Sequence, residues 1–197
     1  MKFLLTVTAL LLTACANETA SQNAPTNTAD TFMAALNAHC GKAYEGRVVS
    51  TDEADRGFAA ERLVMHVRTC SEDIVRIPFH VGDDHSRTWV VTRTENGLRL
   101  KHDHRHEDGT EDAVTQYGGD GAMVSTTRAE FPVDQFSIDM FEREGLTASV
   151  TNVWAMEITD DLFAYELSRE NRFFRVEFDL TNAVPEPPAP WGADEKE

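Results

Sequence analysis

Apolar and polar residues alternate in short segments over most of this 197-residue chain, a period-two pattern typical of strands with one buried face. The pattern is clearest near the C-terminus, where even-numbered residues from Phe174 to Leu180 are apolar and the odd-numbered residues between them are charged. We predict ten strands, at residues 44–50, 62–70, 74–81, 87–94, 98–106, 113–117, 123–131, 149–159, 162–168 and 172–180. The links between them contain turn-forming residues, and Gly118-Gly119-Asp120-Gly121 predicts one such turn.

Two segments have helical rather than alternating spacing. Residues 31–39 place Phe32 and Leu36 on one side and follow Asp30, a suitable N-cap. Residues 132–145 predict a short amphipathic helix within a longer connection. Many short strands with tight links favour antiparallel pairing rather than βαβ units. We therefore expect a mainly β protein, a lipocalin-like antiparallel β-barrel with a short N-terminal helix, and keep a β-sandwich as the alternative.

The N-terminus has the pattern of a bacterial lipoprotein signal. Lys2 supplies a positive charge, and residues 3–12 form an apolar run that is long enough for a secretory signal but too short to span a bilayer. The run ends in Leu12-Thr13-Ala14-Cys15, which resembles the lipobox before which such chains are cut and on whose cysteine they are acylated. By the same resemblance, Ala16 in place of aspartate implies the periplasmic side of the outer membrane. An ordinary signal peptide cut near Ala14 is the alternative.

The cysteine count agrees with this interpretation. The chain has three cysteines, and lipidation of Cys15 leaves Cys40 and Cys70 as a pair in an oxidising compartment. We predict a disulfide between them, with two buried free thiols as the alternative. A redox function is not expected, because the chain has no Cys-x-x-Cys motif.

Composition divides the chain and excludes some partners. We expect a signal peptide at residues 1–14, a flexible tether at 15–30, one β-rich domain at 31–184 and a proline-rich, acidic, disordered tail at 185–197. The 34 acidic and 18 basic residues leave a formal net charge of −16. Such a balance argues against nucleic acid and against anionic lipid head groups as partners.

A run of alternating histidines is the strongest chemical signal. His102, His104 and His106 follow Leu98 and Leu100 at every second position, so on one strand they would share the leucines' inward face. Two neighbouring imidazoles could converge on one divalent metal, for which zinc is the best match and copper the second. Further ligands could come from His66, His80 and His85 or from the nearby carboxylates Glu107, Asp108, Glu111 and Asp112. The alternative is a set of structural histidines paired with carboxylates or exposed at a rim.

Several stretches resemble a family of secreted bacterial proteins whose function is uncharacterised. They are residues 76–89, 97–109, Tyr117-Gly118-Gly119 and 152–158. The resemblance extends over most of the chain from Cys40 to Trp191 and implies a single family-specific domain with no known activity.

We therefore expect a lipid-anchored periplasmic binding protein that holds a divalent metal through the alternating histidines. One alternative is a lipocalin-like carrier of a small apolar ligand, whose interior would be lined by Trp89, Trp154, Phe174 and Phe178. Another is an accessory lipoprotein that binds a second envelope protein. An enzyme is least supported, because no nucleophile has a visible activating partner and the common catalytic and nucleotide-binding motifs are absent from the sequence.

Overall fold

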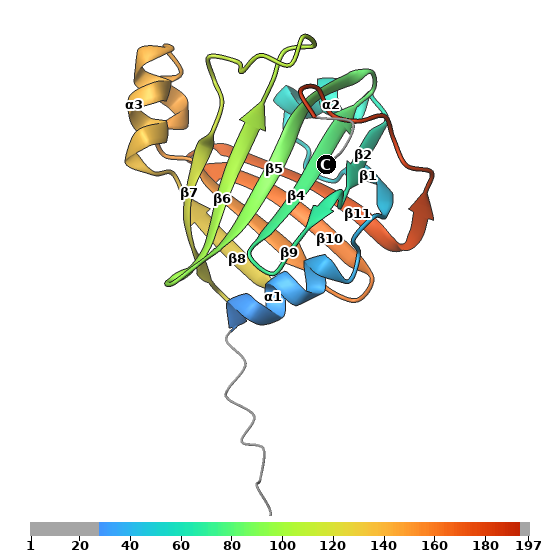
Figure 1. The fold of residues 1–197 in the computed structure, drawn as a ribbon. Helices are drawn as coiled ribbons and strands as arrows, with labels where there is room; N and C mark the ends of the chain where they lie inside the picture. The colour runs from blue at the N-terminus through green and yellow to red at the C-terminus, as the bar shows by residue number, and fades with distance from the viewer. Residues whose placement is uncertain (1–27, 194–197) are drawn as a thin grey trace, which may run out of the picture.

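Eleven strands form one antiparallel sheet in the computed structural model, which describes residues 28–193 (Figure 1). The strands are β1 (Ala43–Val48), β2 (Leu63–His66), β3 (Thr69–Cys70), β4 (Ile74–Val81), β5 (Asp84–Thr94), β6 (Gly97–His104), β7 (Tyr117–Met123), β8 (Arg128–Pro132), β9 (Val153–Ile158), β10 (Leu162–Arg169) and β11 (Arg172–Val184). They pair in the order β2-β1-β11-β10-β9-β8-β7-β6-β5-β4-β3, and β2 also pairs with β4. Ten strands therefore close a ring, with β3 outside it. The predicted mainly β, lipocalin-like barrel is confirmed over the alternative sandwich.

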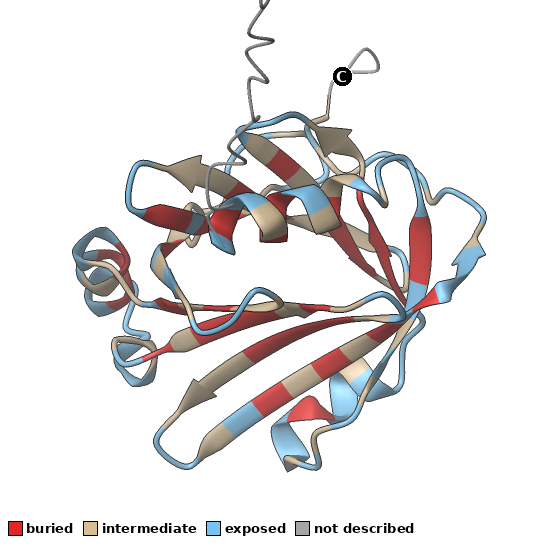
Figure 2. Ribbon diagram, turned by 90° about the horizontal axis from the view of Figure 1, so that it is seen from below, coloured by how far each residue is buried: buried red, intermediate tan, exposed pale blue. Residues whose placement is uncertain are grey.

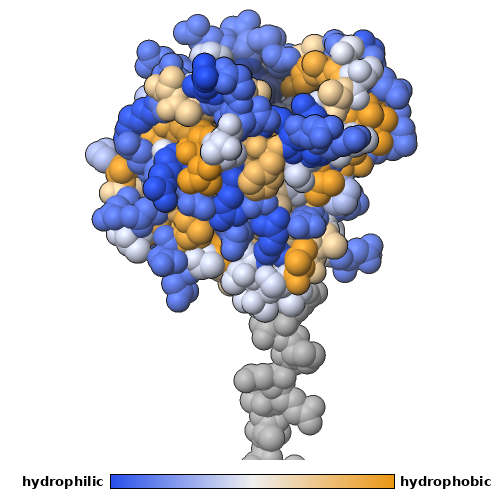
Figure 3. Space-filling model, turned by 180° about the vertical axis from the view of Figure 1, so that it is seen from behind, coloured by the Kyte–Doolittle hydropathy of each residue, from blue (hydrophilic) through white to orange (hydrophobic). Residues whose placement is uncertain are grey.

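Inward-facing residues of the strands form one apolar core inside this ring (Figure 2). On β4, Val75, Ile77 and Phe79 are at most 3% exposed, and on β5 the inward residues Trp89 and Val91 are at most 2% exposed. The residues between them point outward, as the period-two geometry of a strand requires. The rear of the molecule is a mixture of hydrophilic residues and small apolar patches (Figure 3).

Helices lie at the two ends of the barrel (Figure 1). Helix α1 (Thr28–Asn37) covers one end, where Phe32 and Leu36 are fully buried and Asp30 pairs with Arg93 of β5 at 2.5 Å. The helix expected at residues 31–39 is thus present and begins three residues earlier. At the other end lie α2 (Arg56–Ala59), α3 (Gln135–Arg143) and the short 3₁₀ turns η1 (Glu53–Asp55) and η2 (Thr147–Ser149). Helix α3 is the element expected within residues 132–145.

Strand β7 corrects the sequence prediction. Residues 113–116 lie in the connection before it, and the predicted turn at residues 118–121 is instead the middle of the strand. The predicted strand at 123–131 divides between the end of β7 and β8. Glycine is needed here because the neighbouring backbones come very close: a Cβ on Gly118 would overlap the carbonyl of Leu100, and one on Gly119 would overlap the carbonyl of Pro132. The glycines thus allow close approach within a sheet and do not mark a reversal.

The predicted disulfide is present. Cys40, just after α1, is bonded to Cys70 of β3, with their Cα atoms 6.1 Å apart. The bond holds the outer strand β3 to the segment that joins α1 to the barrel. Its sequence separation of 30 residues makes it a long-range constraint on the unfolded chain.

The segment after β11 runs along the outside of the barrel. Residues 185–193, which belong to the expected tail, cross the wall formed by β2, β4 and β5 (Figure 1), and we call them the C-terminal strap. The backbone nitrogen of Trp191 donates to the carbonyl of His85 at 3.0 Å. The predicted signal peptide, Cys15 and most of the tether lie outside the described residues. Among the helices of residues 28–193, none is long and apolar enough to cross a membrane.

Candidate functional site

The end of the barrel opposite α1 contains a cavity of about 270 Å³, which we call the barrel cavity. Its walls come from inward-facing aromatic residues of β4, β5, β9, β10 and β11, and its mouth from α2, from the linker between α3 and β9, and from strand ends. The wall residues are Phe79, Trp89, Trp154, Tyr165 and Phe174. A mainly apolar cleft with a few polar groups is the usual form of a small-molecule site.

Stacked rings give the cavity a rigid wall. Trp89 lies between Phe79 and Tyr165, with ring centroids 4.7 and 4.4 Å from its own and interplanar angles of 15° and 19°. Trp89, Trp154 and Phe174 line the cavity, as predicted for the interior. Phe178, the fourth predicted residue, is fully buried in the core and does not line the cavity.

His102 lies deep in this wall and has partners on both ring nitrogens. Its Nδ1 is 3.0 Å from the backbone carbonyl of Tyr117, and its Nε2 is 2.7 Å from the hydroxyl of Tyr165. Since a carbonyl can only accept, Nδ1 carries the hydrogen and Nε2 accepts from the tyrosine. Burial lowers the pKa of His102 to about 3, so the ring is neutral at ordinary pH. These contacts identify a structural, hydrogen-bonded imidazole.

His104 lies nearer the mouth on the same strand face. Its Nε2 is 3.0 Å from the hydroxyl of Tyr117, whose ring also stacks on His102 at a centroid distance of 4.5 Å. Burial and the nearby Arg87 lower the pKa of His104 to about 4. His102 and His104 therefore do share the inward face, and both line the barrel cavity as neutral polar groups.

Three arginines line the mouth of the cavity at strand ends, and two of them are neutralised. Arg87 lies 2.7 Å from Asp84, and Arg172 pairs with Asp52 at 3.4 Å and with Asp55. Arg169, the last residue of β10, makes no ion pair with any carboxylate in residues 28–193. The one polar contact of its guanidinium there is to the amide oxygen of Asn152, at 3.1 Å. The mouth thus holds one guanidinium that is free to pair with an anion.

The other predicted histidines lie elsewhere. His80 alternates with Phe79 on β4, so it faces outward, and its Nδ1 lies 2.8 Å from Nδ1 of His85 beside the C-terminal strap. Burial and the neighbouring His85 lower the pKa of His80 to about 4. His106 is exposed beyond the end of β6, and His66 is buried on β2 with its Nε2 4.0 Å from Glu186 of the strap. The barrel wall therefore separates His80 and His85 from His102 and His104.

No group of three or more histidine, cysteine, aspartate or glutamate side chains in the described part of the chain is arranged to hold a metal ion. The five predicted ligands lie in three places: inside the barrel, beneath the strap and on an exposed loop. A metal ion on His102 would also have to replace one of its two hydrogen bonds. Metal binding by these residues stays a prediction.

The sequence did not indicate Tyr117, Tyr165 or Arg169 as site residues. Tyr165 shares the alternating inward face of residues 163–167, which would have been a usable signal. The sequence alone could not identify Arg169 as a site residue. Its significance is that its guanidinium stays unpaired among residues 28–193, which depends on which arginines obtain carboxylate partners from distant segments. The resulting arrangement suits reversible binding of a small molecule with an apolar body and a polar end. No family model, curated protein or solved structure matches the chain.

Proposed function

We propose that this protein is a carrier that binds a small amphipathic anion in the barrel cavity. The observation that supports the proposal is an aromatic cavity with Arg169 at its mouth, the one lining guanidinium that has no carboxylate partner within residues 28–193. An apolar body would pack against Trp89 and Trp154, and an acidic group would pair with Arg169. The volume of about 270 Å³ is near the lower limit of roughly 300 Å³ for small-molecule pockets, which favours a small ligand.

The local charge at the mouth, not the net charge of the chain, favours an anion over a neutral ligand. The chain has a net charge of −16, so an anion gains from the surface as a whole no attraction that would bring it to this end. A local unpaired arginine is therefore the feature that would select it. A hydrogen bond to a charged group contributes about 1.5–3 kcal/mol, which corresponds to a change of roughly tenfold to a hundredfold in affinity.

Two fluorescent probes that differ by one group test this proposal on the purified full chain. 8-Anilino-1-naphthalenesulfonate is an aromatic anion, and N-phenyl-1-naphthylamine is the same ring system without the sulfonate. Trp89 and Trp154 line the cavity, so energy transfer from tryptophan reports a probe bound near them, and the Arg169 variant below assigns the position of the probe. A Trp191→Phe background removes the tryptophan of the strap. We expect both probes to bind, with the sulfonate binding about tenfold or more tightly.

Matched arginine variants assign the anion contact. Arg169→Gln should weaken binding of the sulfonate about tenfold and leave the neutral probe unchanged. Arg99→Gln, which removes an outward-facing arginine paired with Asp120, should change neither. Failure of both probes to bind would overturn the carrier proposal, and unchanged sulfonate binding by Arg169→Gln would overturn the role of Arg169.

The location of the carrier is also a proposal. The lipobox Leu12-Thr13-Ala14-Cys15 supports a chain anchored by lipid on Cys15, on the periplasmic side of the outer membrane. The test is incorporation of labelled palmitate in a bacterial host followed by fractionation. Label should appear on the protein and be lost in Cys15→Ser, and label retained by that variant would contradict the assignment.

The predicted zinc site at His102 and His104 can be examined in the same experiments. A zinc ion bound there would compete with the probes, since both histidines line the barrel cavity. Zinc that displaces neither probe would place any metal outside the cavity.

A further inference from the structure

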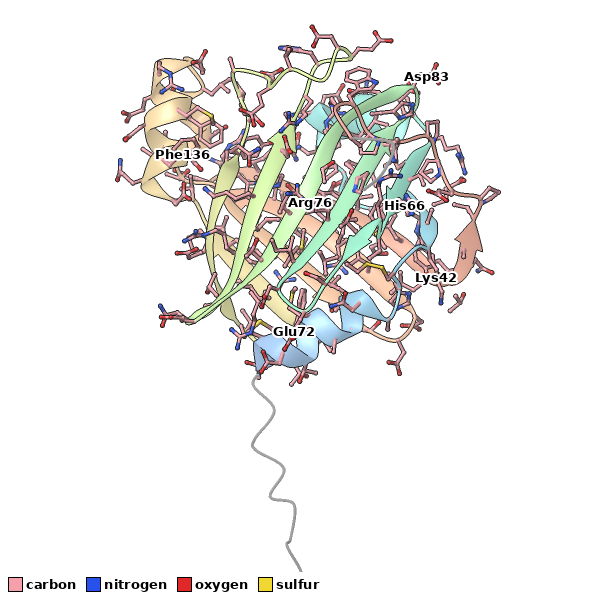
Figure 4. The ribbon with its side chains drawn as sticks, viewed as in Figure 1. Lys42, His66, Glu72, Arg76, Asp83 and Phe136 are labelled. Carbon is pink, nitrogen blue, oxygen red and sulfur yellow. A yellow bond between two sulfur atoms is a disulfide. The ribbon has the colours of Figure 1, made fainter. Side chains whose placement is uncertain are left out.

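A second cavity lies outside the barrel, between the wall and the C-terminal strap. It has a volume of about 270 Å³, and its lining includes Arg68, Arg76 and Arg105 together with the end of the strap at residues 190–193. Arg76 lies near the middle of β4, on the side of the barrel that faces the viewer in Figure 4, and points away from the core. We call this site the arginine pocket.

The pairing of arginines over the whole barrel singles out Arg76. The chain has fourteen arginines, all within the described residues, and twelve of them lie within 4.0 Å of a carboxylate. The two without such a carboxylate in residues 28–193 are Arg169 and Arg76, and each lines a cavity. In a chain with almost twice as many acidic as basic residues, unpaired arginines are unexpected unless something else supplies the negative charge.

The neighbours of Arg76 strengthen the positive charge. The backbone nitrogen of Arg68, the residue before β3, donates to the carbonyl of Arg76 of β4 at 3.1 Å, so the two residues are neighbours. The guanidinium of Arg68 has only a 3.6 Å contact with Glu186, whose side chain is 61% exposed. Arg105 is held by Asp103 at 3.1 Å and by Glu111 at 3.2 Å. Among residues 28–193, Asp103 is thus the one carboxylate of the lining, and it is already paired with Arg105.

Uncharged groups of the lining indicate the kind of anion. Thr69, Thr88 and Gln116 add hydrogen-bonding side chains, and Trp191 is the one aromatic ring in the lining. This differs from the barrel cavity, whose walls are aromatic. Several arginines with extra donors match the many acceptor oxygens of a phosphate or of a compact di- or tricarboxylate.

We propose that the arginine pocket binds a compact polyvalent oxyanion, with Arg76 as the residue that recognises it and Arg68 and Arg105 beside it. This site is separate from the barrel cavity, so the proposal stands apart from the carrier function. Two sources could supply the negatively charged oxygens that these arginines would bind. One is a free anion, and the other is the chain's own acidic end, because Asp194, Glu195 and Glu197 follow Ala193, which lines the pocket.

Calorimetric titration of inorganic phosphate and of citrate into the purified full chain tests the proposal at neutral pH. We expect binding that Arg76→Gln weakens at least tenfold. Arg99→Gln is the control, since it removes an outward-facing arginine that is fully paired with Asp120. Sulfate should compete, whereas added chloride should act only through general screening.

A chain that ends at Ala193 distinguishes the two sources. Equal binding by the full and shortened chains assigns the pocket to a free anion. Binding that appears or strengthens only in the shortened chain, and that Arg76→Gln abolishes, assigns it to the acidic end of the chain. Absence of binding by both chains up to about 10 mM of either anion, or binding that Arg76→Gln leaves unchanged, overturns the proposal.

The two arginine variants also separate this site from the carrier function. Arg76→Gln should leave binding of the naphthalenesulfonate unchanged, and Arg169→Gln should leave binding of phosphate and citrate unchanged. Loss of both activities in either variant, with its urea unfolding transition unchanged, would show that the two cavities are not independent sites and would overturn the assignment of the oxyanion to the outer wall.

Discussion

Lowering the pH from 6.5 to 5 should strongly destabilise the barrel, because the folded protein keeps three histidines as neutral rings. The pKa values of His102, His104 and His80 are lowered to about 3, about 4 and about 4, chiefly by burial. In this range the folded protein leaves these rings unprotonated, whereas the unfolded chain protonates them. Since the unfolded state then binds more protons, the free energy of unfolding falls as the pH falls.

The size of the effect follows from linkage. A histidine that titrates near 6.5 only when unfolded lowers the free energy of unfolding by about 1.6 kcal/mol between pH 6.5 and 5, so three lower it by about 5 kcal/mol. All three folded-state pKa values lie below pH 5, so the result depends mainly on the unfolded-state value. Burial also lowers the pKa values of His39 and His66, which adds in the same direction. A loss of this size is a large share of the roughly 5–15 kcal/mol typical of a folded domain.

Urea unfolding followed by tryptophan fluorescence at several pH values between 7.5 and 5 measures this slope. In His102→Gln the amide can still donate to Tyr117 and accept from Tyr165 but cannot titrate, so the part of the slope due to His102, His104 and His80 should fall by about one third. Tyr165→Phe is the control: it should lower the free energy of unfolding by about 1–3 kcal/mol at every pH without changing the slope. A free energy of unfolding that is constant from pH 6.5 to 5 would refute the reasoning.

Two further predictions concern stability. Replacing both Cys40 and Cys70 by serine should lower the free energy of unfolding by about 3–4 kcal/mol, measured by urea unfolding, because the disulfide closes a separation of 30 residues; an unchanged midpoint would contradict this. Gly119→Ala should prevent folding or destabilise the barrel severely, because the new Cβ overlaps the carbonyl of Pro132. Gly57→Ala is the control: a Cβ there meets nothing within 4 Å, so the melting temperature should stay the same or rise slightly. Similar melting temperatures for the two alanine variants would contradict the packing at β7.

Much of the fold could be predicted because it depends on local alternation. Strands at residues 74–81, 98–104 and 162–169 each have one face of apolar residues, and a one-residue shift in pairing would expose the whole face to water. The same argument correctly placed His102 and His104 on the inner face behind Leu100. The glycine-rich segment at residues 118–121 misled the prediction, because glycine permits both a tight turn and a close approach of neighbouring strands.

The sequence by itself determined the alternating strands, the pairing of Cys40 with Cys70 and the inward face of the histidine strand. These properties depend on local period and on residue chemistry. Only the tertiary structure decided that a wall of the barrel separates His80 from His102, and that Arg76 and Arg169 obtain no carboxylate among residues 28–193. The physical reason is that burial and ion pairing depend on contacts between residues far apart in the chain, which strand order and barrel closure bring together.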